Sequence, residues 1–274
     1  MLATPPRVIV PAAGYGSRLR PLTYAIPKEM LPVGRKTVLD YVMAELFSSG
    51  LREVLIILSP LKNMIREYLK DGASLGMHIE YACQEEMRGL GDAILKGEEW
   101  VGGHSFVVAF GDCIISSNSS HSPLNRMLQC HESSPQTAIT LCETVDADHV
   151  HRYGILDPAY PANINGVDPF PLRDIIEKPS RDLAPSHFAV AARWILPPGI
   201  FPFLHEVQKD PCGEINLTDA VRNWMRSGGE TWAVPLSNSE KRWDIGGWES
   251  YFTASIHMIL SDEEYGERIK SQIA

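Results

Sequence analysis

The first 112 residues alternate between apolar runs and amphipathic stretches, and this alternation constrains the fold more than any other feature of the sequence. Four segments have the pattern of strands: 7–13, 54–58, 77–84 and 106–110. Three segments have the helical repeat of apolar residues: 37–49, 61–70 and 91–100. Strands that are mostly apolar and separated by helices predict a parallel sheet that is covered on both faces.

Two of these helices allow more specific predictions. Thr37 precedes the first of them and is expected to cap its N-terminus, because a threonine side chain accepts a hydrogen bond from the first turn. In the second helix, Leu61, Ile65, Tyr68 and Leu69 are spaced to share one face. We expect these four side chains to point into the core.

The second half of the chain is less regular. Four further strands are expected, at 137–144, 172–178, 188–196 and 232–236. Two further helices are expected, at 219–227 with Thr218 as its cap, and at 248–260. No linker, repeat or low-complexity segment divides the chain. We therefore predict a single α/β domain over residues 1–274, with a Rossmann-like, mostly parallel sheet flanked by helices and a smaller subregion in the second half.

Composition argues against several classes of protein. A hydrophobic content of 44% is sufficient for one large core. No apolar run approaches the roughly 18 residues of a membrane span, so a cytoplasmic protein with no membrane partner is expected. The five cysteines include no CxxC pair, which argues against a disulfide framework or a cysteine zinc site. The formal net charge of −9 argues against nucleic acid as a partner.

A basic, glycine-containing loop follows the first predicted strand. Residues 14–36 include five cations and one acidic residue, Glu29. Glycines at this place let backbone N–H groups approach phosphates closely, so the loop is a candidate phosphate site. The loop is not a Walker A motif, because GxxxxGK[ST] is absent. It is not a dinucleotide fingerprint either, because Leu19 occupies the position of the third glycine.

Polar residues stand where two other predicted strands end. Ligands of open α/β sheets bind beyond the carboxyl ends of the strands. Gln84 ends the third predicted strand and Asp112 follows the fourth, which makes both of them candidate ligand-binding residues. Taken alone, Asp112 is better explained as a residue that begins a turn than as a metal ligand.

The sequence GYGSRLRPLTYAIPKEMLPV, residues 14–33, resembles the signature of the sugar-1-phosphate nucleotidyltransferases. Within this family the sequence is most similar to the bacterial UTP–glucose-1-phosphate uridylyltransferases. The similarity continues in order through Gln84, 89–91, 111–112, 152–154, 176–179, 213–220 and Asp244. It covers nearly the whole chain, from Arg7 to the last predicted helix.

The resemblance implies a magnesium-dependent enzyme that transfers a uridylyl group from UTP to glucose 1-phosphate and releases pyrophosphate. It implies a nucleotide-binding half at about 7–112 and a sugar-binding and closing half at about 136–260. Since the reaction joins two anions, catalysis is expected to consist mostly of positioning and charge stabilisation, as in-line displacement without a covalent intermediate.

The resemblance also assigns residues to the nucleotide. Arg18 is expected to hold the triphosphate tail, and Lys28 to contact the phosphates near the reacting phosphorus. Gln84 and the backbone at Gly89 are expected to bind the pyrimidine base. The remaining expected nucleotide contacts are in the loop itself: Ala13, Gly14, Gly16 and Ser17.

The other expected roles concern the metal ion and the sugar phosphate. Asp112 and Asp244 are expected to hold Mg²⁺, which commonly uses one or two carboxylates together with substrate phosphates. Gly154 and Glu177 are expected to bind sugar hydroxyls, and Lys178 the sugar phosphate. The catalytic set implied by the resemblance is therefore Arg18, Lys28, Asp112 and Lys178.

The sequence departs from the family pattern at several positions. Tyr24 stands where a second lysine is usual, Ala192 where a glycine is usual, and Cys83 where an arginine is common. The DIGG segment at Asp244 resembles more distant relatives. These departures bear on the choice of substrate more than on the type of reaction.

Three functions therefore remain open. The first is UDP-glucose synthesis, and the second is the same chemistry with dTTP or with another sugar 1-phosphate. The third is a catalytically silent nucleotide-sugar sensor or regulatory protein, against which the presence of Lys28, Asp112, Lys178 and Asp244 argues. A homo-oligomer, either a dimer or a tetramer, is expected.

Overall fold

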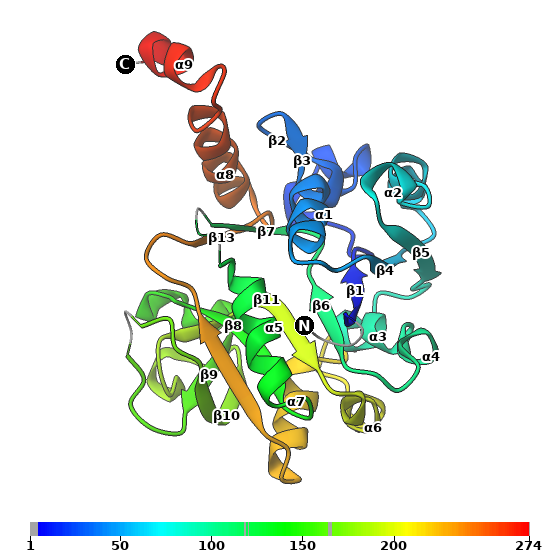
Figure 1. Cartoon of the computed structure of the whole chain (residues 1–274), viewed down its shortest axis with the longest axis vertical. Coiled ribbons are helices and arrows are strands. Elements are labelled where there is room, and N and C mark those ends of the chain that lie inside the picture. Colours follow the sequence, from blue (N-terminus) through cyan, green and yellow to red (C-terminus); the bar gives the residue numbers. More distant parts are fainter. Residues whose placement is uncertain (1–4, 118, 120, 164–165, 274) are drawn as a thin grey trace.

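The computed structural model describes residues 5–117, 119, 121–163 and 166–273, and its centre is a nine-stranded sheet (Figure 1). The strands lie in the order β5-β4-β1-β6-β11-β8-β12-β10-β9. Their bounds are β1 (Arg7–Pro11), β4 (Glu53–Leu58), β5 (His78–Cys83), β6 (Phe106–Ala109), β8 (Ala138–Thr144), β9 (Gly154–Pro158), β10 (Phe170–Glu177), β11 (Phe188–Leu196) and β12 (Thr231–Pro235). Two smaller sheets pair β2 (Pro32–Val33) with β3 (Lys36–Thr37), and β7 (Cys113–Ser116) with β13 (Lys241–Asp244).

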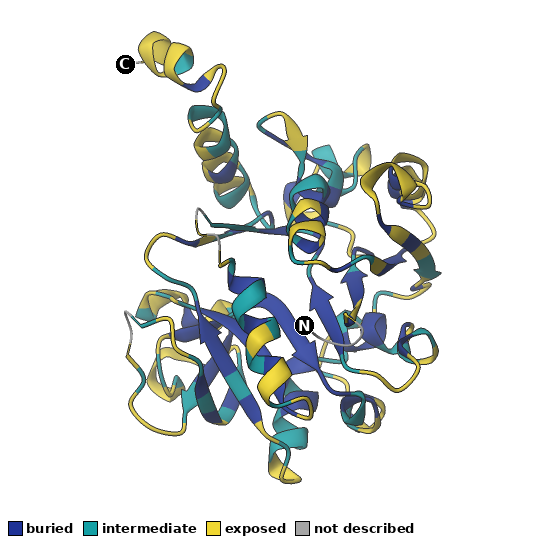
Figure 2. Cartoon of the chain, viewed as in Figure 1, coloured by how far each residue is buried: buried dark blue, intermediate teal, exposed yellow. Residues whose placement is uncertain are grey.

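The α-helices cover both faces of the large sheet. Their bounds are α1 (Val38–Ser48), α2 (Asn63–Leu69), α3 (Gly89–Leu95), α4 (Glu98–Val101), α5 (Pro123–Ser133), α6 (Phe201–Glu206), α7 (Leu217–Arg226), α8 (Trp248–Leu260) and α9 (Gly266–Ile273). Residues of α1, α2 and α5 share one apolar core with the sheet, and residues of α3, α6 and α7 share another. The strands are largely buried between these layers (Figure 2).

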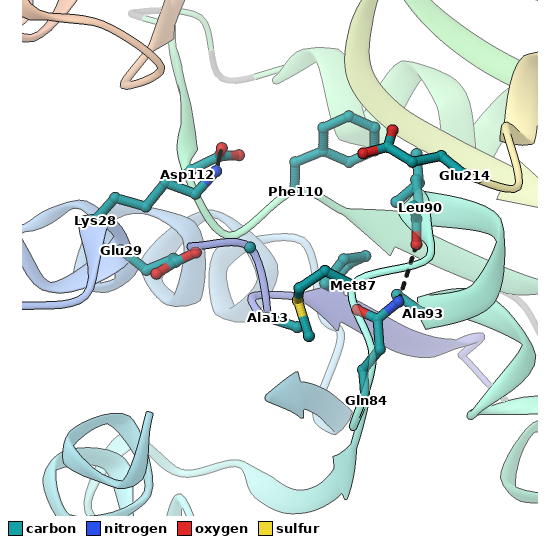
Figure 3. A pocket seen from close by; sticks show the side chains of 13 residues that line it. Ala13, Lys28, Glu29, Gln84, Met87, Leu90, Ala93, Phe110, Asp112 and Glu214 are labelled. Carbon is teal, nitrogen blue, oxygen red and sulfur yellow. Dashed lines mark hydrogen bonds and ion pairs between the residues drawn. The ribbon is translucent and has the colours of Figure 1, made fainter. Parts of the chain in front are cut away.

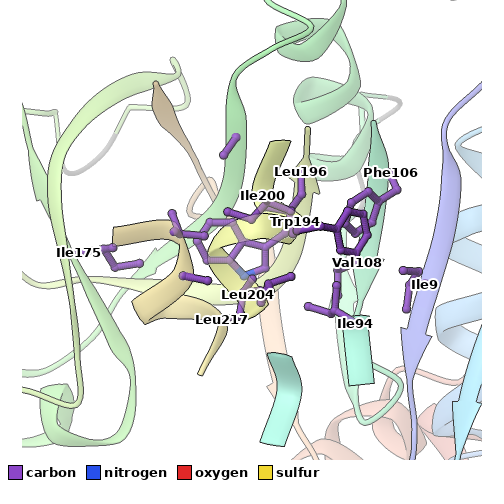
Figure 4. Close-up of a cluster of buried hydrophobic side chains, with 14 of the residues drawn as sticks. Ile9, Ile94, Phe106, Val108, Ile175, Trp194, Leu196, Ile200, Leu204 and Leu217 are labelled. Atoms are coloured by element: carbon purple, nitrogen blue, oxygen red, sulfur yellow. The ribbon is translucent and has the colours of Figure 1, made fainter. Parts of the chain in front are cut away.

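Alternation along the strands divides their side chains between the two cores. Val8 and Val10 of β1 belong to the core under α1, whereas Ile9 between them belongs to the other. This period of two is expected for a strand that is buried on both faces. In the second core, Trp194 of β11 is 1% exposed and lies among side chains that come from both halves of the chain (Figure 4).

The α/β class is confirmed, and the pairing differs between the two halves. The strands β5, β4, β1 and β6 are all parallel, as the alternation of the first 112 residues predicts. Beyond β6 the sheet is mixed: β11 is antiparallel to both of its neighbours in the strand order, and β12 is parallel to β8. The carboxyl ends of β1, β5 and β6 therefore meet at one edge.

Several local predictions are confirmed and others are wrong. Thr37 caps α1, and its side chain accepts a hydrogen bond from the backbone of Asp40. Leu61 does not face the core and is 82% exposed, because α2 begins only at Asn63. Tyr68 is half exposed, and its hydroxyl donates to Asp40 instead. The predicted helix at 91–100 is divided into α3 and α4.

The last two helices extend away from the sheet (Figure 1). One face of α8 packs with Tyr251, Ala254 and Met258 against a small core that includes Trp243. Within the part of the chain that the structure describes, no helix combines the length and the apolar character that crossing a membrane requires.

Candidate active site

Two adjoining cavities open at the carboxyl ends of β1, β5 and β6. The first has a volume of about 250 Å³ and the second about 1240 Å³. Predicted site residues in the lining of the first are Ala13, Gly14, Lys28, Gln84, Gly89 and Asp112 (Figure 3). Those in the lining of the second are Arg18, Asp112, Gly154, Glu177, Lys178 and Asp244. Asp112 thus belongs to both cavities, and of the predicted residues only Gly16 and Ser17 line neither of them.

The side-chain amide of Gln84 is held in one orientation. Its Nε2 donates to the carboxylate of Asp92 at 2.8 Å and to the carbonyl of Gly89 at 3.0 Å. Both partners are acceptors, so the NH₂ end of the amide must face them. No donor among the described residues pairs with Oε1 of Gln84, which leaves this acceptor for a ligand in the first cavity.

The wall beside Gln84 requires glycine at two positions. Gly89 has a φ of +89°, and a Cβ there would lie 2.8 Å from Cβ of Glu214. A Cβ at Gly91 would lie 2.5 Å from Cγ2 of Ile215. The backbones are also hydrogen-bonded, from Gly91 N to the Ile215 carbonyl at 2.8 Å and from Ile215 N to the Arg88 carbonyl at 2.7 Å. This contact ties the second half of the chain to the first cavity.

The phosphate loop, defined here as residues 12–29, leaves β1 and returns to the site at Lys28. The Nζ of Lys28 is ion-paired to Oδ2 of Asp112. Burial lowers the pKa of Lys28, but the charges of Asp112 and Glu29 outweigh burial and raise it above its usual value. A cation is therefore held firmly at the junction of the two cavities.

The two aspartates come together through the small sheet of β7 and β13. Asp244 ends β13 opposite Cys113, and Ile245 N donates to the carbonyl of Asp112 at 3.0 Å. Burial would raise the pKa of Asp112, but Lys28 lowers it below the usual range. Burial and the charge of Asp112 raise the pKa of Asp244. A divalent cation would relieve this repulsion, so the pair fits a metal that completes its shell with waters and substrate oxygens.

Among the described residues, the structure shows no larger metal-binding cluster than this pair. Within residues 5–117, 119, 121–163 and 166–273, no group of three or more histidine, cysteine, aspartate and glutamate side chains could hold a metal ion. His149 lines the second cavity but does not belong to a group of this kind. The two aspartates are thus the candidate metal ligands.

The opposite side of the second cavity is built from β9 and β10. Glu177 lies opposite Gly154 in this antiparallel pair, and the Nζ of Lys178 is 3.4 Å from the Glu177 carboxylate. A Cβ at Gly154 would lie 3.2 Å from Oε2 of Glu177 and 3.1 Å from Oγ1 of Thr218. A side chain at position 154 would therefore crowd these two polar groups of the cavity wall. Lys178 has a φ of +45°, an uncommon conformation for a residue other than glycine.

Sequence reasoning missed several polar residues of the site. Thr218 was expected to cap a helix, but Asn216 is the N-cap of α7 and Thr218 lines the cavity. Arg242 of β13 is ion-paired to Glu143 and stacks over Tyr153. Arg242 and Glu143 are far apart in sequence, so no local motif signals this pair.

Residues 7–260 match the family model described as nucleotidyl transferase, and the chain belongs to this family. It is a nucleotidyltransferase enzyme, and enzymes of this family generally use a divalent metal ion. The resemblance to sugar-1-phosphate nucleotidyltransferases is thereby confirmed.

Three relatives indicate which branch of the family this chain is similar to. A UTP–glucose-1-phosphate uridylyltransferase of Staphylococcus epidermidis is 29% identical over 97% of this chain and 96% of its own. A UDP-glucose pyrophosphorylase complexed with UDP-glucose is 31% identical, with a TM-score of 0.82 and coverage of 92% of this chain and 97% of that one. The UTP-bound UGPase from Acinetobacter baumannii is 26% identical, with a TM-score of 0.85 and coverage of 98% and 99%.

Proposed function

We propose that the enzyme transfers a uridylyl group from UTP to glucose 1-phosphate, giving UDP-glucose and pyrophosphate. The observation that carries this proposal is the pair of cavities that adjoin at Asp112. One suits a pyrimidine base and the other a sugar phosphate, so the two substrates meet beside Lys28 and the aspartates. The relatives that bind UTP and UDP-glucose support the same substrates.

The first cavity selects the base through Gln84. Uracil carries a hydrogen on N3, and the free Oε1 of Gln84 accepts it. Cytosine has a lone pair at N3, which would face the same Oε1 without a hydrogen bond. The close contacts at Gly89 and Gly91 keep this wall near Gln84, so we expect the cavity to favour a pyrimidine over the larger purine base.

The second cavity binds the sugar phosphate. The Glu177 carboxylate accepts hydrogen bonds from adjacent sugar hydroxyls, and Lys178 binds the anomeric phosphate beside it. The backbone of Gly154, which lines the same cavity, contacts a further edge of the ring in this proposal. These contacts orient the sugar phosphate oxygen toward the α-phosphorus.

Catalysis is positioning and charge stabilisation. Arg18 holds the triphosphate tail that leaves as pyrophosphate, and Lys28 stabilises charge on the transferring phosphorus. Asp112 and Asp244 hold Mg²⁺, which when bound neutralises phosphate charge. The sugar phosphate attacks in line, so no side-chain nucleophile is needed.

Residues 1–274 act as a single catalytic domain in this proposal. Residues 7–112 bind the nucleotide, and 136–260 bind the sugar and close the site. The nine-stranded sheet contains strands of both parts, which supports a single domain. The enzyme works as a homo-oligomer, for which α8 offers an apolar surface.

A second candidate is the use of dTTP. Thymine presents the same hydrogen-bonding edge to Gln84 as uracil, so only the C5 methyl and the ribose 2′-OH distinguish the two substrates. A single methyl is worth about 1–3 kcal/mol. We therefore expect measurable dTTP turnover that is slower than UTP turnover.

A pyrophosphate-release assay tests the proposal over UTP, dTTP, CTP and ATP, each with glucose 1-phosphate and galactose 1-phosphate. UTP should exceed CTP by at least about 10²-fold in kcat/KM, because CTP leaves Gln84 unpaired. Glucose 1-phosphate should exceed galactose 1-phosphate by at least about tenfold. A preference for CTP or for a purine nucleotide would overturn the proposal.

A further inference from the structure

Lys62 contacts both ends of the phosphate loop. Its Nζ donates to the carbonyl of Ala12 at 2.8 Å, where the chain has just left β1. The same Nζ donates to both carboxylate oxygens of Glu29, at 2.9 and 2.7 Å, where the loop ends. An ammonium group has three N–H donors, so these contacts use all of them.

Stability alone does not explain this buried ion pair. The side chains of Lys62 and Glu29 are 8% and 1% exposed. Burial raises the pKa of Glu29 and lowers that of Lys62, so desolvation opposes the charge on both groups. An apolar pair of similar volume is often at least as stable as a buried ion pair.

The place of Glu29 suggests a different role for the pair. Glu29 follows Lys28 in the chain, and both residues line the first cavity (Figure 3). The carboxylates of Glu29 and Asp112 both attract the Lys28 ammonium. Because Lys62 holds both oxygens of Glu29, Lys28 pairs with Asp112 instead.

We propose that Lys62 is a positioning residue, which fixes both ends of the phosphate loop and neutralises Glu29 so that Lys28 is directed at Asp112 and at the nucleotide phosphates. Lys62 lines neither cavity, so it acts through Glu29 and Ala12 and not by touching substrate. The inference rests on the proposed function of Lys28 and extends it.

Lys62→Met tests this inference, because methionine keeps much of the side-chain volume and removes the charge. Glu29 then attracts Lys28 away from Asp112. We expect kcat/KM for UTP to fall by about 10²-fold or more, as when one well-placed electrostatic contact is lost. The KM for glucose 1-phosphate should change by less than about threefold, because the contacts at Glu177 and Lys178 are untouched.

A second substitution separates positioning from general destabilisation. Glu29→Gln in the Lys62→Met background removes the competing charge, so at least about tenfold of the lost kcat/KM should return. Arg126→Met is the matched control, since Arg126 is ion-paired to buried Glu240 and lines neither cavity. It should lower the melting temperature with no selective effect on UTP. If Glu29→Gln gives no recovery, or both methionine variants lose activity in proportion to stability, Lys62 is merely structural.

A direct titration of each protein with UTP keeps this test independent of the proposed reaction. Lys62→Met should weaken UTP binding, and Glu29→Gln should restore part of it, whether or not glucose 1-phosphate is the acceptor. If the wild type binds UTP but turns over another sugar phosphate, the sugar assignment fails and the role of Lys62 stands. Equal UTP affinity of Lys62→Met and wild type overturns the inference.

Discussion

Ala192 has a left-handed backbone, with a φ of +59°, inside the irregular part of β11. It lines the second cavity, and its carbonyl accepts a hydrogen bond from Phe110 N at 3.2 Å. The conformation explains why glycine suits this position, since a Cβ in the left-handed region is strained. Ala192 therefore retains a methyl on the wall of the cavity despite this strain.

Ala192→Gly should change sugar selectivity more than stability. Relief of backbone strain and the larger entropy of the unfolded glycine chain oppose each other, so the free energy of unfolding should change by less than about 1 kcal/mol. The ratio of kcat/KM for glucose 1-phosphate to that for galactose 1-phosphate should change about tenfold, because a methyl leaves the pocket. Ala191→Gly is the control. Ala191 is buried in the apolar core that the sheet shares with α1, α2 and α5, and it does not line the second cavity, so its substitution should leave the ratio unchanged.

Lys178 is expected to bind the sugar phosphate and not the nucleotide. Lys178→Ala removes the expected phosphate contact, so the KM for the sugar phosphate should rise by about tenfold or more while UTP affinity is unchanged. Lys70 offers a matched control, because it is another lysine with a positive φ, +52°, and lies outside both cavities. Steady-state kinetics and a UTP titration decide the matter. An equal loss for both substrates would assign Lys178 a structural role.

The aspartate pair predicts a strict metal requirement. Asp244→Asn should lower kcat by about 10²–10³-fold with little change in the melting temperature, because a contact made to transition-state charge is lost. Asp262→Asn, in an exposed turn, should have no such effect. Activity should vanish in EDTA and return with added Mg²⁺. Full activity in EDTA would contradict the metal assignment.

Among the secondary-structure elements, helix α8 carries a stripe of solvent-exposed apolar side chains. Trp248, Phe252 and Ile256 recur every fourth residue, and they are 36%, 53% and 55% exposed. Residues at this spacing share one face of a helix. Figure 2 shows that α8 presents exposed and half-buried residues over much of its length.

This stripe is expected to join two copies of the chain. Phe252→Glu should convert an oligomer to monomers in sedimentation velocity, because a charge placed in an apolar contact is costly. Leu183→Glu, which changes an exposed apolar residue outside α8, should leave the oligomer intact. A wild-type protein that sediments as a monomer would exclude this role for α8.

The nine-stranded sheet joins the two halves of the chain, so we expect the whole molecule to unfold as one unit. Residues of both halves share the core around Trp194, and the backbones of Gly91 and Ile215 are hydrogen-bonded across the halves. We expect calorimetry to show one cooperative unfolding transition, and its melting temperature should rise when UTP is added. At a UTP concentration of one hundred times the Kd, the free energy of unfolding should increase by about 2.7 kcal/mol. Two transitions, with only one responding to UTP, would mean that the halves unfold separately.

The sequence predicted the elements whose pattern is local. The strand at 188–196 and the helix at 248–260 have the predicted bounds, because apolar runs and helical periodicity are properties of neighbouring residues. The inward placement of Leu61 was wrong because periodicity does not say where a helix begins, and α2 starts at Asn63. The inward placement of Tyr68 was wrong because its hydroxyl donates to Asp40, a contact that a helical repeat does not reveal.

Most of the candidate site was reached through the family resemblance, and physics alone would have missed much of it. Asp112 and Asp244 are adjacent only because β7 pairs with β13. The contact from Lys62 to Glu29 and the pair of Arg242 with Glu143 likewise join residues that share no motif. Contacts of this kind depend on tertiary packing, and a single sequence does not encode them in any short spacing.

The fixed amide of Gln84 has a consequence for anyone who wishes to redesign the enzyme for cytosine. The orientation of that amide is set by the Gly89 carbonyl and by Asp92, and Asp92 does not line the cavity. Replacing Asp92 by a hydrogen-bond donor would remove one of these two acceptors and offer a partner to Oε1 of the reversed amide, whose NH₂ group matches the N3 lone pair of cytosine. The preference between uracil and cytosine would then shift through a residue that does not line the cavity, so a library confined to the lining residues would omit that position.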